Sequence, residues 1–433
     1  MRILSRDEIL TKCILLSVIV LSITGYLLFS WDEQMVYVLL AMNLLTVYFS
    51  RNMQAAMLIF IFMFTYNFHY LYNWQGIQLS PYGQFQKMDY YNYSSMLSLL
   101  LFSGVILTMR LNGNSLRKRS IFSFLKNREC SVVWFWVCAC VCCVILFFLQ
   151  RQGINLLFAS GDLYSLYRDN LDSVSGLAVY FYIFFFLLFI YRPNPFYNVV
   201  IWIILIWYLW FALTRGMRML MVPPVLMCFF YFFENKFRSI WIIVFSGLGV
   251  FLLSAINRFK NNLPLWGGEN ETDVLINNQA ELLYGSNAAI GTVREMMIGV
   301  IDRLELFGGY IVSCLFPPSV LPDSLKFPHY LATLHLEFGG GGLIVSSFYV
   351  MLGVMGPMLL GMYLGWIINY VYERNNTNCY LSLFFVFSFI LVTRWYSYDA
   401  NLLFRLSFYT LGVMGVFKLI ERVSHGKKES VNC

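Results

Sequence analysis

Long apolar runs separated by short polar connections fill the sequence from its first residues to its last. About 20 apolar residues cross a bilayer core, and fewer are enough where flanking side chains reach the interface. By this measure we predict about twelve membrane-spanning helices, in an all-α polytopic membrane protein. Their expected ranges are 9–29, 35–49, 55–72, 93–110, 131–149, 176–191, 199–214, 219–233, 240–256, 341–370, 379–393 and 403–420. The first run lacks a cleavage site and is expected to remain in the product.

One polar stretch, residues 257–338, is far longer than any other connection. It divides the chain into an N-terminal bundle at 1–256 with about nine spans, this large loop, and a C-terminal bundle of about three spans with a tail at 339–433. Helical spacing of apolar residues in the loop predicts an amphipathic helix on the membrane surface, which either roofs a cleft or shields the bundle. The apolar positions are Ile290, Val293, Met297, Val300, Ile301 and Leu304, and the other faces carry Arg294, Glu295, Asp302, Arg303 and Glu305.

Composition and charge agree with this architecture. Hydrophobic residues make up 59% of the chain and charged residues 12%, and the mean hydropathy is +0.65, whereas soluble domains carry about 25% charged residues. Basic clusters gather in the short even-numbered connections, which indicates that these face the cytoplasm, together with both termini. The net charge of +7 follows from these clusters, so no nucleic-acid partner is expected.

The ten cysteines do not form a recognisable framework. Cys138, Cys140, Cys142 and Cys143 fall inside one apolar run, and the others are scattered. Such positions are typical of small core residues. We therefore expect no disulfide framework, no metal and no cofactor.

Arginine dominates the cations of the connections expected outside the cytoplasm. Its planar fork binds phosphate through two hydrogen bonds, so this preference indicates a phosphorylated ligand at that face. Pairing with the acidic residues of the same connections is the alternative. The arginines are Arg151, Arg168, Arg215, Arg218, Arg258, Arg294, Arg303, Arg394 and Arg405.

A tight hairpin at 213–218 places Arg215 and Arg218 at the membrane boundary, where charge is costly unless it is paired. Pro223 and Pro224 follow, and we expect them to break the next helix one turn inside the membrane and to leave backbone groups facing a cavity. A packing kink between two helices is the alternative.

Two further segments carry candidate chemistry. His329, His335 and Glu337 precede a glycine quartet at 339–342, where free N–H groups at a helix start favour an anion; histidines at such places also serve as hydrogen-bonded structural residues. The turn at 393–405 combines aromatic rings with Arg394, Asp399 and Arg405. This combination is typical of sugar sites, and an interfacial aromatic belt with a salt bridge is the alternative.

These features together resemble the Wzy-type O-antigen polymerases, which are bacterial inner-membrane enzymes. The resemblance covers most of the chain as architecture: about twelve spans, one large periplasmic loop in the second half, a Glu-x-Gly-rich entry to a long helix and the Thr-Arg-Gly-Met-Arg turn at 214–218. The related O-antigen ligases carry a histidine about eleven residues before a glycine, a spacing that His329 and Gly340 reproduce. Tyr330 departs from the small polar residue that follows in ligases, which favours a polymerase over a ligase.

The resemblance implies glycosyl transfer at the periplasmic face. The growing chain on undecaprenyl pyrophosphate is the donor, a lipid-linked repeat unit is the acceptor, and a chain-length regulator protein is an expected partner. The reaction needs a base near the acceptor hydroxyl and fixed positive charge for the departing pyrophosphate. We assign the charge to Arg215, Arg218, Arg394 and Arg405 with Arg294 as a helper, and the base to Glu337, followed by His335, His329 and Asp399.

Two other classes of protein stay open at this stage. A flippase or other transporter for lipid-linked oligosaccharides would also have about twelve spans, but transporters place ionisable groups at mid-depth and show repeated halves. Here charge gathers at the boundary and one connection far exceeds the others. A non-catalytic membrane scaffold would leave the arginine preference unexplained.

Overall fold

The structure is a computed structural model of the whole chain. It describes residues 6–74, 89–111, 120–125, 131–159, 176–234, 236–260, 298–317, 320–322, 342–373, 378–397 and 399–431, with single positions at 166, 169, 170, 174, 286, 289–291, 293 and 294. Within these residues, side chains are described except those of 72–74, 89, 91, 218, 250, 253, 254, 256–260 and 425–431.

Every regular element in the described residues is helical. The α-helices are α1 (Arg6–Phe29), α2 (Asp32–Phe49), α3 (Gln54–Asn67), α4 (His69–Trp74), α5 (Asp89–Thr108), α6 (Val132–Gln150), α8 (Leu177–Tyr191), α9 (Asn198–Thr214), α10 (Arg218–Phe233), α11 (Ser239–Lys260), α13 (Val300–Leu315), α15 (Ile344–Leu352), α16 (Met355–Glu373), α17 (Cys379–Ile390), α18 (Val392–Trp395) and α19 (Arg405–Val431). Three short 3₁₀ helices are η2 (Ser123–Leu125), η3 (Pro195–Tyr197) and η5 (Ala400–Leu403).

Four helical stretches in the described residues are long and apolar enough to cross a membrane: Arg6–Phe29, Gln54–Leu71, Val132–Gln150 and Pro195–Thr214. Five shorter apolar helices accompany them. This confirms an all-helical protein with helices suited to a membrane. The expected number of twelve spans stays a prediction.

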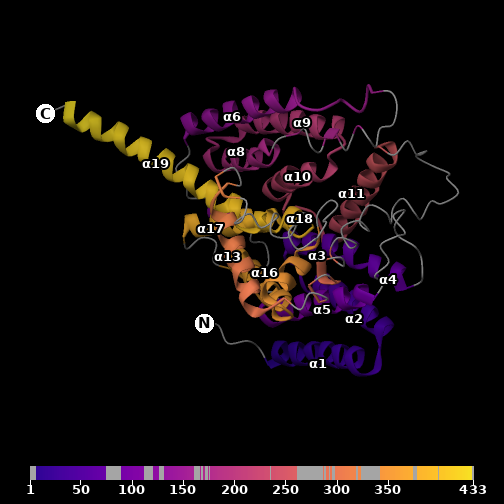
Figure 1. Cartoon of the computed structure of the whole chain (residues 1–433). Helices are drawn as coiled ribbons and strands as arrows, with labels where there is room; N and C mark the ends of the chain where they lie inside the picture. The colour runs from indigo at the N-terminus through magenta and orange to yellow at the C-terminus, as the bar shows by residue number, and fades with distance from the viewer. Residues whose placement is uncertain are drawn as a thin grey trace.

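The helices form two groups that a central set joins (Figure 1). In this view α6, α8, α9 and α10 lie at the top and α1, α2 and α5 at the bottom, with α13, α16, α17 and α18 between them. The last turns of α19 extend beyond the bundle. Helices from the start and the end of the chain are thus packed into one body.

Glycines bring α5 and α16 into close contact, the most extensive one between two helices of the described residues. A Cβ added at Gly361 would collide with the Leu101 carbonyl, one at Gly365 with Thr108, and one at Gly104 with the Met358 carbonyl. Small residues four apart allow such backbone contact between membrane helices. The sequence Gly361-Met-Tyr-Leu-Gly365 therefore fixes how the C-terminal helices pack onto the N-terminal ones.

The run at 341–370, expected to be one long helix, is two. Gly353 separates α15 from α16 and adopts φ +65, a left-handed conformation that glycine reaches without a steric penalty. A Cβ at Gly356 would collide with the Phe348 carbonyl, so the turn is too tight for larger residues there. The expected spans 55–72 and 379–393 are likewise each divided into two helices, α3 with α4 and α17 with α18.

The expected break at Pro223 and Pro224 does not occur, because α10 continues through both prolines. Pro224 has no N–H to donate to the carbonyl of Leu220, one helical turn earlier. The Tyr182 hydroxyl of α8 donates to that carbonyl at 3.0 Å instead. A neighbouring helix thus satisfies the freed backbone group, and no cavity is needed for it.

The amphipathic helix expected over 290–304 is not one continuous helix. The helix there, α13, begins only after Gly299, which has extended backbone angles, so the period does not run from residue 290 to 304 as one helix. Val300 and Ile301 are each 73% exposed. The face that packs against the bundle carries Leu306, Tyr310, Ser313 and Cys314.

Polar contacts gather at two ends of the bundle. At one end the Glu234 carboxylate accepts hydrogen bonds from the Ser120 hydroxyl and the Ile121 N–H, both at 2.8 Å, and from the Tyr372 hydroxyl at 2.9 Å. The other end contains α13 and Arg405. We call them the Glu234 end and the Arg405 end.

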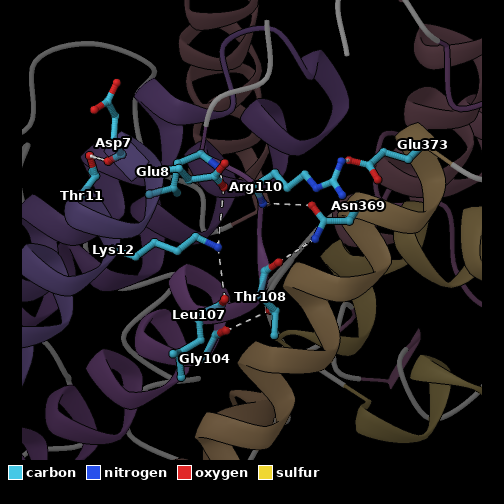
Figure 2. Close-up of polar contacts among 11 residues, drawn as sticks. Asp7, Glu8, Thr11, Lys12, Gly104, Leu107, Thr108, Arg110, Asn369 and Glu373 are labelled. Atoms are coloured by element: carbon cyan, nitrogen blue, oxygen red, sulfur yellow. Dashed lines mark hydrogen bonds and ion pairs between the residues drawn. The ribbon is translucent and has the colours of Figure 1, made fainter. Parts of the chain in front are cut away.

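A second polar cluster at the Glu234 end surrounds the C-terminus of α5 (Figure 2). Lys12 and Asn369 donate to carbonyls of its last turn at 3.2 and 2.6 Å, and Arg110 forms an ion pair with Glu373. Cations near the last carbonyls of a helix interact favourably with its dipole. The groups in this cluster therefore satisfy one another and hold α1, α5 and α16 together.

Candidate functional site

The segment 391–405, which we call the arginine turn, lies where several helices of the Arg405 end meet. Its helix α18 contacts α3, α10 and α17, and η5 contacts α13 and α19. Asp399 begins η5 by accepting a hydrogen bond from the Asn401 N–H at 3.0 Å, and its own N–H donates to the Arg394 carbonyl at 3.2 Å. This N-cap interaction explains an aspartate at that position, and it occupies one oxygen of the carboxylate that we considered as a substitute base.

The buried face of α13 lies directly on the arginine turn. The Tyr310 hydroxyl donates to the Ala400 carbonyl at 3.0 Å, and the Ser313 hydroxyl lies 2.7 Å from Oδ1 of Asn401. Arg405 Nε donates back to the Ser313 carbonyl at 2.8 Å. Of the two roles expected for a helix in this region, these contacts favour a cover over the turn.

Arg405 carries a buried charge with no ion pair among the described residues. Its side chain is 7% exposed, and Nε binds a neutral carbonyl. Burying an unpaired guanidinium is costly, because the protein interior replaces little of its lost hydration. A phosphate or another anion beside Arg405 would offset this cost.

Arg215 is buried in a similar way at the hairpin between α9 and α10. Gly216 adopts φ +70 and donates to the Leu213 carbonyl, while Met217 donates to the Ala212 carbonyl, so the helix end is a Schellman motif. This turn directs Arg215 toward the C-terminal end of α6.

Two of the nitrogens of Arg215 cap α6. Nε and Nη2 each donate at 2.8 Å, to the carbonyls of Gln152 and Gln150. Burial lowers the pKa of Arg215 below its ordinary value, and among the described residues Arg215 has no carboxylate partner. Its Nη1 is buried without a hydrogen-bond partner in that part of the chain. One nitrogen of a charged fork is thus available to a ligand.

Arg394 completes this set of arginines. It is half-buried in α18, and its charge interacts with the phenols of Tyr182 and Tyr208 from α8 and α9. Its helix α18 contacts α10, which begins three residues after Arg215. The structure therefore places Arg215, Arg394 and Arg405 at the same end of the bundle, with α8, α9 and α10 beside the first two.

Several buried hydroxyl oxygens in and just after the arginine turn have no hydrogen-bond partner among the described residues. Each such group costs about 1–3 kcal/mol when nothing binds it, so they indicate places for water or for a polar ligand. They belong to Thr393, Tyr396, Ser407 and Tyr409.

The other predicted site residues are Arg294, Arg218, His329, His335 and Glu337. Arg294 is exposed and stacks on Tyr93 of α5, with its guanidinium carbon 4.3 Å from the ring centre. Arg218 is the first residue of α10, and its side chain is outside the described part. His329, His335 and Glu337 also lie outside the described residues, so their roles stay predictions.

Sequence reasoning missed the tyrosines around the arginines. Tyr182, Tyr208 and Tyr310 are fully buried, and each donates its hydroxyl to a backbone carbonyl of another element. Their signal in the sequence is a hydroxyl inside an otherwise apolar run. Because 29 tyrosines are spread over the chain, this signal alone does not distinguish them.

Comparisons with protein-family models, with curated proteins and with solved structures give no match for this chain.

Proposed function

We propose that the protein is an O-antigen polymerase, a glycosyltransferase that joins lipid-pyrophosphate-linked oligosaccharide repeat units into long polysaccharide. The observation that carries this proposal is the burial of Arg215 and Arg405 without a carboxylate partner in the described residues, at one end of an apolar helical protein. Two fixed guanidinium groups suit a pyrophosphate that gains negative charge as it leaves. The membrane helices suit a substrate with a long lipid chain.

The reaction that fits these groups is a substitution at the anomeric carbon of the donor sugar. The acceptor hydroxyl forms the new C–O bond, the bond from that carbon to the pyrophosphate oxygen breaks, and the hydroxyl proton passes to a base. Arg215, Arg394 and Arg405 hold the lipid pyrophosphate, with Arg218 as a further member of the set. Glu337 is our first choice for the base, and His335 and His329 are the next.

We place the Arg405 end outside the cytoplasm and the Glu234 end inside, in the bacterial inner membrane. This orientation follows the distribution of basic residues: Arg117, Lys118 and Arg119 directly precede Ser120 in the sequence, and Ser120 donates a hydrogen bond to Glu234. Both termini are then cytoplasmic. A chain-length regulator protein is the expected partner.

Surface polysaccharide from a strain that lacks only this gene tests the proposal. We expect the gel ladder to collapse to core plus a single repeat, and a plasmid copy to restore it. Loss of every capped band would indicate a ligase or a flippase instead. An unchanged ladder would remove the protein from the pathway.

A further inference from the structure

A polar cleft at the start of α5 is not used by the proposed reaction. It forms where the end of α1, the start of α2, the start of α5 and the segment of Arg294 converge, and it has a volume of about 330 Å³. This size lies at the lower end of small-molecule sites, roughly 300–1,000 Å³. Its lining residues are Tyr26, Leu27, Ser30, Asp32, Asn92, Tyr93 and Arg294.

Arg294 is held in this cleft by its neighbours. Gly291 lies so close to Tyr90 that an added Cβ would be 2.8 Å from the ring, and Ile290 and Val293 are buried. Arg294 therefore emerges from an anchored segment and lies over the Tyr93 ring at 4.3 Å. Its position depends on packing and is not that of a freely moving surface side chain.

Two opposite charges share the cleft without pairing. Asp32 interacts with the Asn92 amide, and Arg294 contacts the rings of Tyr90 and Tyr93, but the two charged groups form no ion pair with each other. A free anion would be repelled by Asp32 and a free cation by Arg294. A neutral ligand with many hydroxyl groups would instead bind both, because hydroxyls donate to the carboxylate and accept from the guanidinium.

The cleft and the arginine turn lie at opposite ends of α13. Tyr93 contacts Tyr349 of α15, with ring centres 5.5 Å apart, and Arg303 near the start of α13 donates to the Tyr349 carbonyl at 2.6 Å. Ser313 near the end of α13 touches the arginine turn. Ten residues of helix separate these two contacts by about 15 Å. An oligosaccharide, but not a single sugar ring, bridges that distance.

We propose that this cleft is a second, saccharide-binding site, which holds sugar residues of the chain remote from the lipid pyrophosphate. This inference extends the proposed function. It rests on that function only in identifying the bound saccharide as part of the polymerase substrate. Arg294 then binds sugar, and it is not the helper in pyrophosphate binding that the sequence pattern predicted.

Binding of free oligosaccharides to the full chain in lipid nanodiscs tests the inference. The probe is the surface polysaccharide of the source strain, cut by mild acid to short oligosaccharides, and the readout is saturation-transfer NMR with titration. We expect Arg294→Gln and Asp32→Asn each to weaken binding at least fivefold. The control variants Arg151→Gln and Glu33→Gln should bind the oligosaccharides as tightly as the unaltered chain does. Arg151 is an exposed arginine outside the cleft that also stacks on a ring, 4.1 Å from the centre of Phe147. Glu33 is adjacent to Asp32 in the sequence but does not line the cleft.

Two results would overturn the inference: no binding by the unaltered chain, or equal binding by the cleft variants. Inorganic pyrophosphate is the second probe. If pyrophosphate binding depends on Arg294 and oligosaccharide binding does not, the cleft is an anion site and the saccharide role is rejected. Arg294 is exposed, so its substitution leaves the fold intact even if Asp32→Asn does not accumulate. The binding assay requires no catalytic turnover. Its result is therefore independent of the gel of the deletion strain, which tests the polymerase proposal.

Discussion

Arg405 donates from Nε to the backbone carbonyl of Ser313, at 2.8 Å and across 92 positions of sequence. This contact joins α13 to the arginine turn, and the Ser313 hydroxyl with Asn401 reinforces it. The group that we assign to the pyrophosphate is thus also the group that positions the covering helix. We therefore expect that binding of a ligand to Arg405 changes the position of α13.

Arg405→Lys separates the charge from the guanidinium geometry. Lysine keeps one positive charge but cannot donate to the Ser313 carbonyl and to a phosphate oxygen from one planar fork. We expect the rate of polymer formation to fall roughly 10²-fold, as for the loss of one charge-stabilising donor in other enzymes. The measurement is incorporation of labelled repeat units by membranes with matched protein levels. Arg151→Lys is the control, and a normal rate for Arg405→Lys would exclude Arg405 from the pyrophosphate site.

Arg215 is expected to contribute to stability as well as to ligand binding. Arg215→Ala removes the donors for the carbonyls of Gln150 and Gln152, and each unsatisfied carbonyl costs about 1–3 kcal/mol. The thermal unfolding temperature in detergent should therefore fall. For Arg215→Lys we expect a smaller decrease, because an ammonium group can still donate to one of the two carbonyls. If Arg215→Ala unfolds at the same temperature as the unaltered chain, the capping of α6 has no energetic role.

The contact between α5 and α16 predicts a sensitive glycine. Gly361→Ala places a methyl group against the Leu101 carbonyl, so the two helices must separate. We expect a clear loss of thermal stability and of folded protein in the membrane. Gly412→Ala in α19 is the matched control, because an added Cβ there meets nothing within 4 Å. Equal behaviour of the two variants would contradict the close packing of α5 and α16.

Stability should depend on pH through Glu234, which lies beyond the last residue of α10. Burial raises the pKa of Glu234 from 4.5 to about 7, although hydrogen bonds from Ile121, Ser120 and Tyr372 act in the opposite direction. The folded state therefore holds a proton that the unfolded state releases between about pH 4.5 and 7. Its contribution is fully present below pH 4.5 and is lost as pH rises through about 7, by at most about 3 kcal/mol.

Unfolding temperatures between pH 5 and 8 measure this effect. The unaltered chain should lose stability as pH rises, and Glu234→Gln should show a flatter profile because the amide does not titrate. Glu33→Gln changes a carboxylate in the first turn of α2, away from Glu234, and should leave the slope of unfolding temperature against pH unchanged. A slope that Glu234→Gln leaves unchanged would assign the pH dependence to other groups.

Hydrophobic patterning predicted the helices well, because the apolar runs that suit a membrane are also the runs that pack here. Each expected span contains a helix, from α1 to α19. The breaks were not predictable from apolar character alone: Gly353 ends α15 through a left-handed turn, whereas Pro223 and Pro224 leave α10 intact because Tyr182 satisfies a freed carbonyl. Such outcomes depend on a neighbouring helix and not on local sequence.

The candidate site was predictable in residue type but not in grouping. The preference for arginine pointed to Arg215, Arg394 and Arg405, which lie at one end of the bundle. Arg294 carries the same chemistry in the sequence, and only its packing against Tyr90 and Tyr93 assigns it to another cleft. The helix expected over 290–304 is interrupted at Gly299, whose extended backbone angles spacing alone does not reveal.

Reconstitution of the full chain in lipid vesicles with a purified lipid-pyrophosphate-linked repeat unit tests the central claim most directly. We predict that the unaltered protein alone forms a ladder of lipid-linked polymer and releases lipid pyrophosphate, one molecule for each bond formed, and that Arg405→Lys forms neither product at a comparable rate. Intact repeat units after prolonged incubation, with the protein folded and the substrate in the same bilayer, would contradict the assignment as a polymerase.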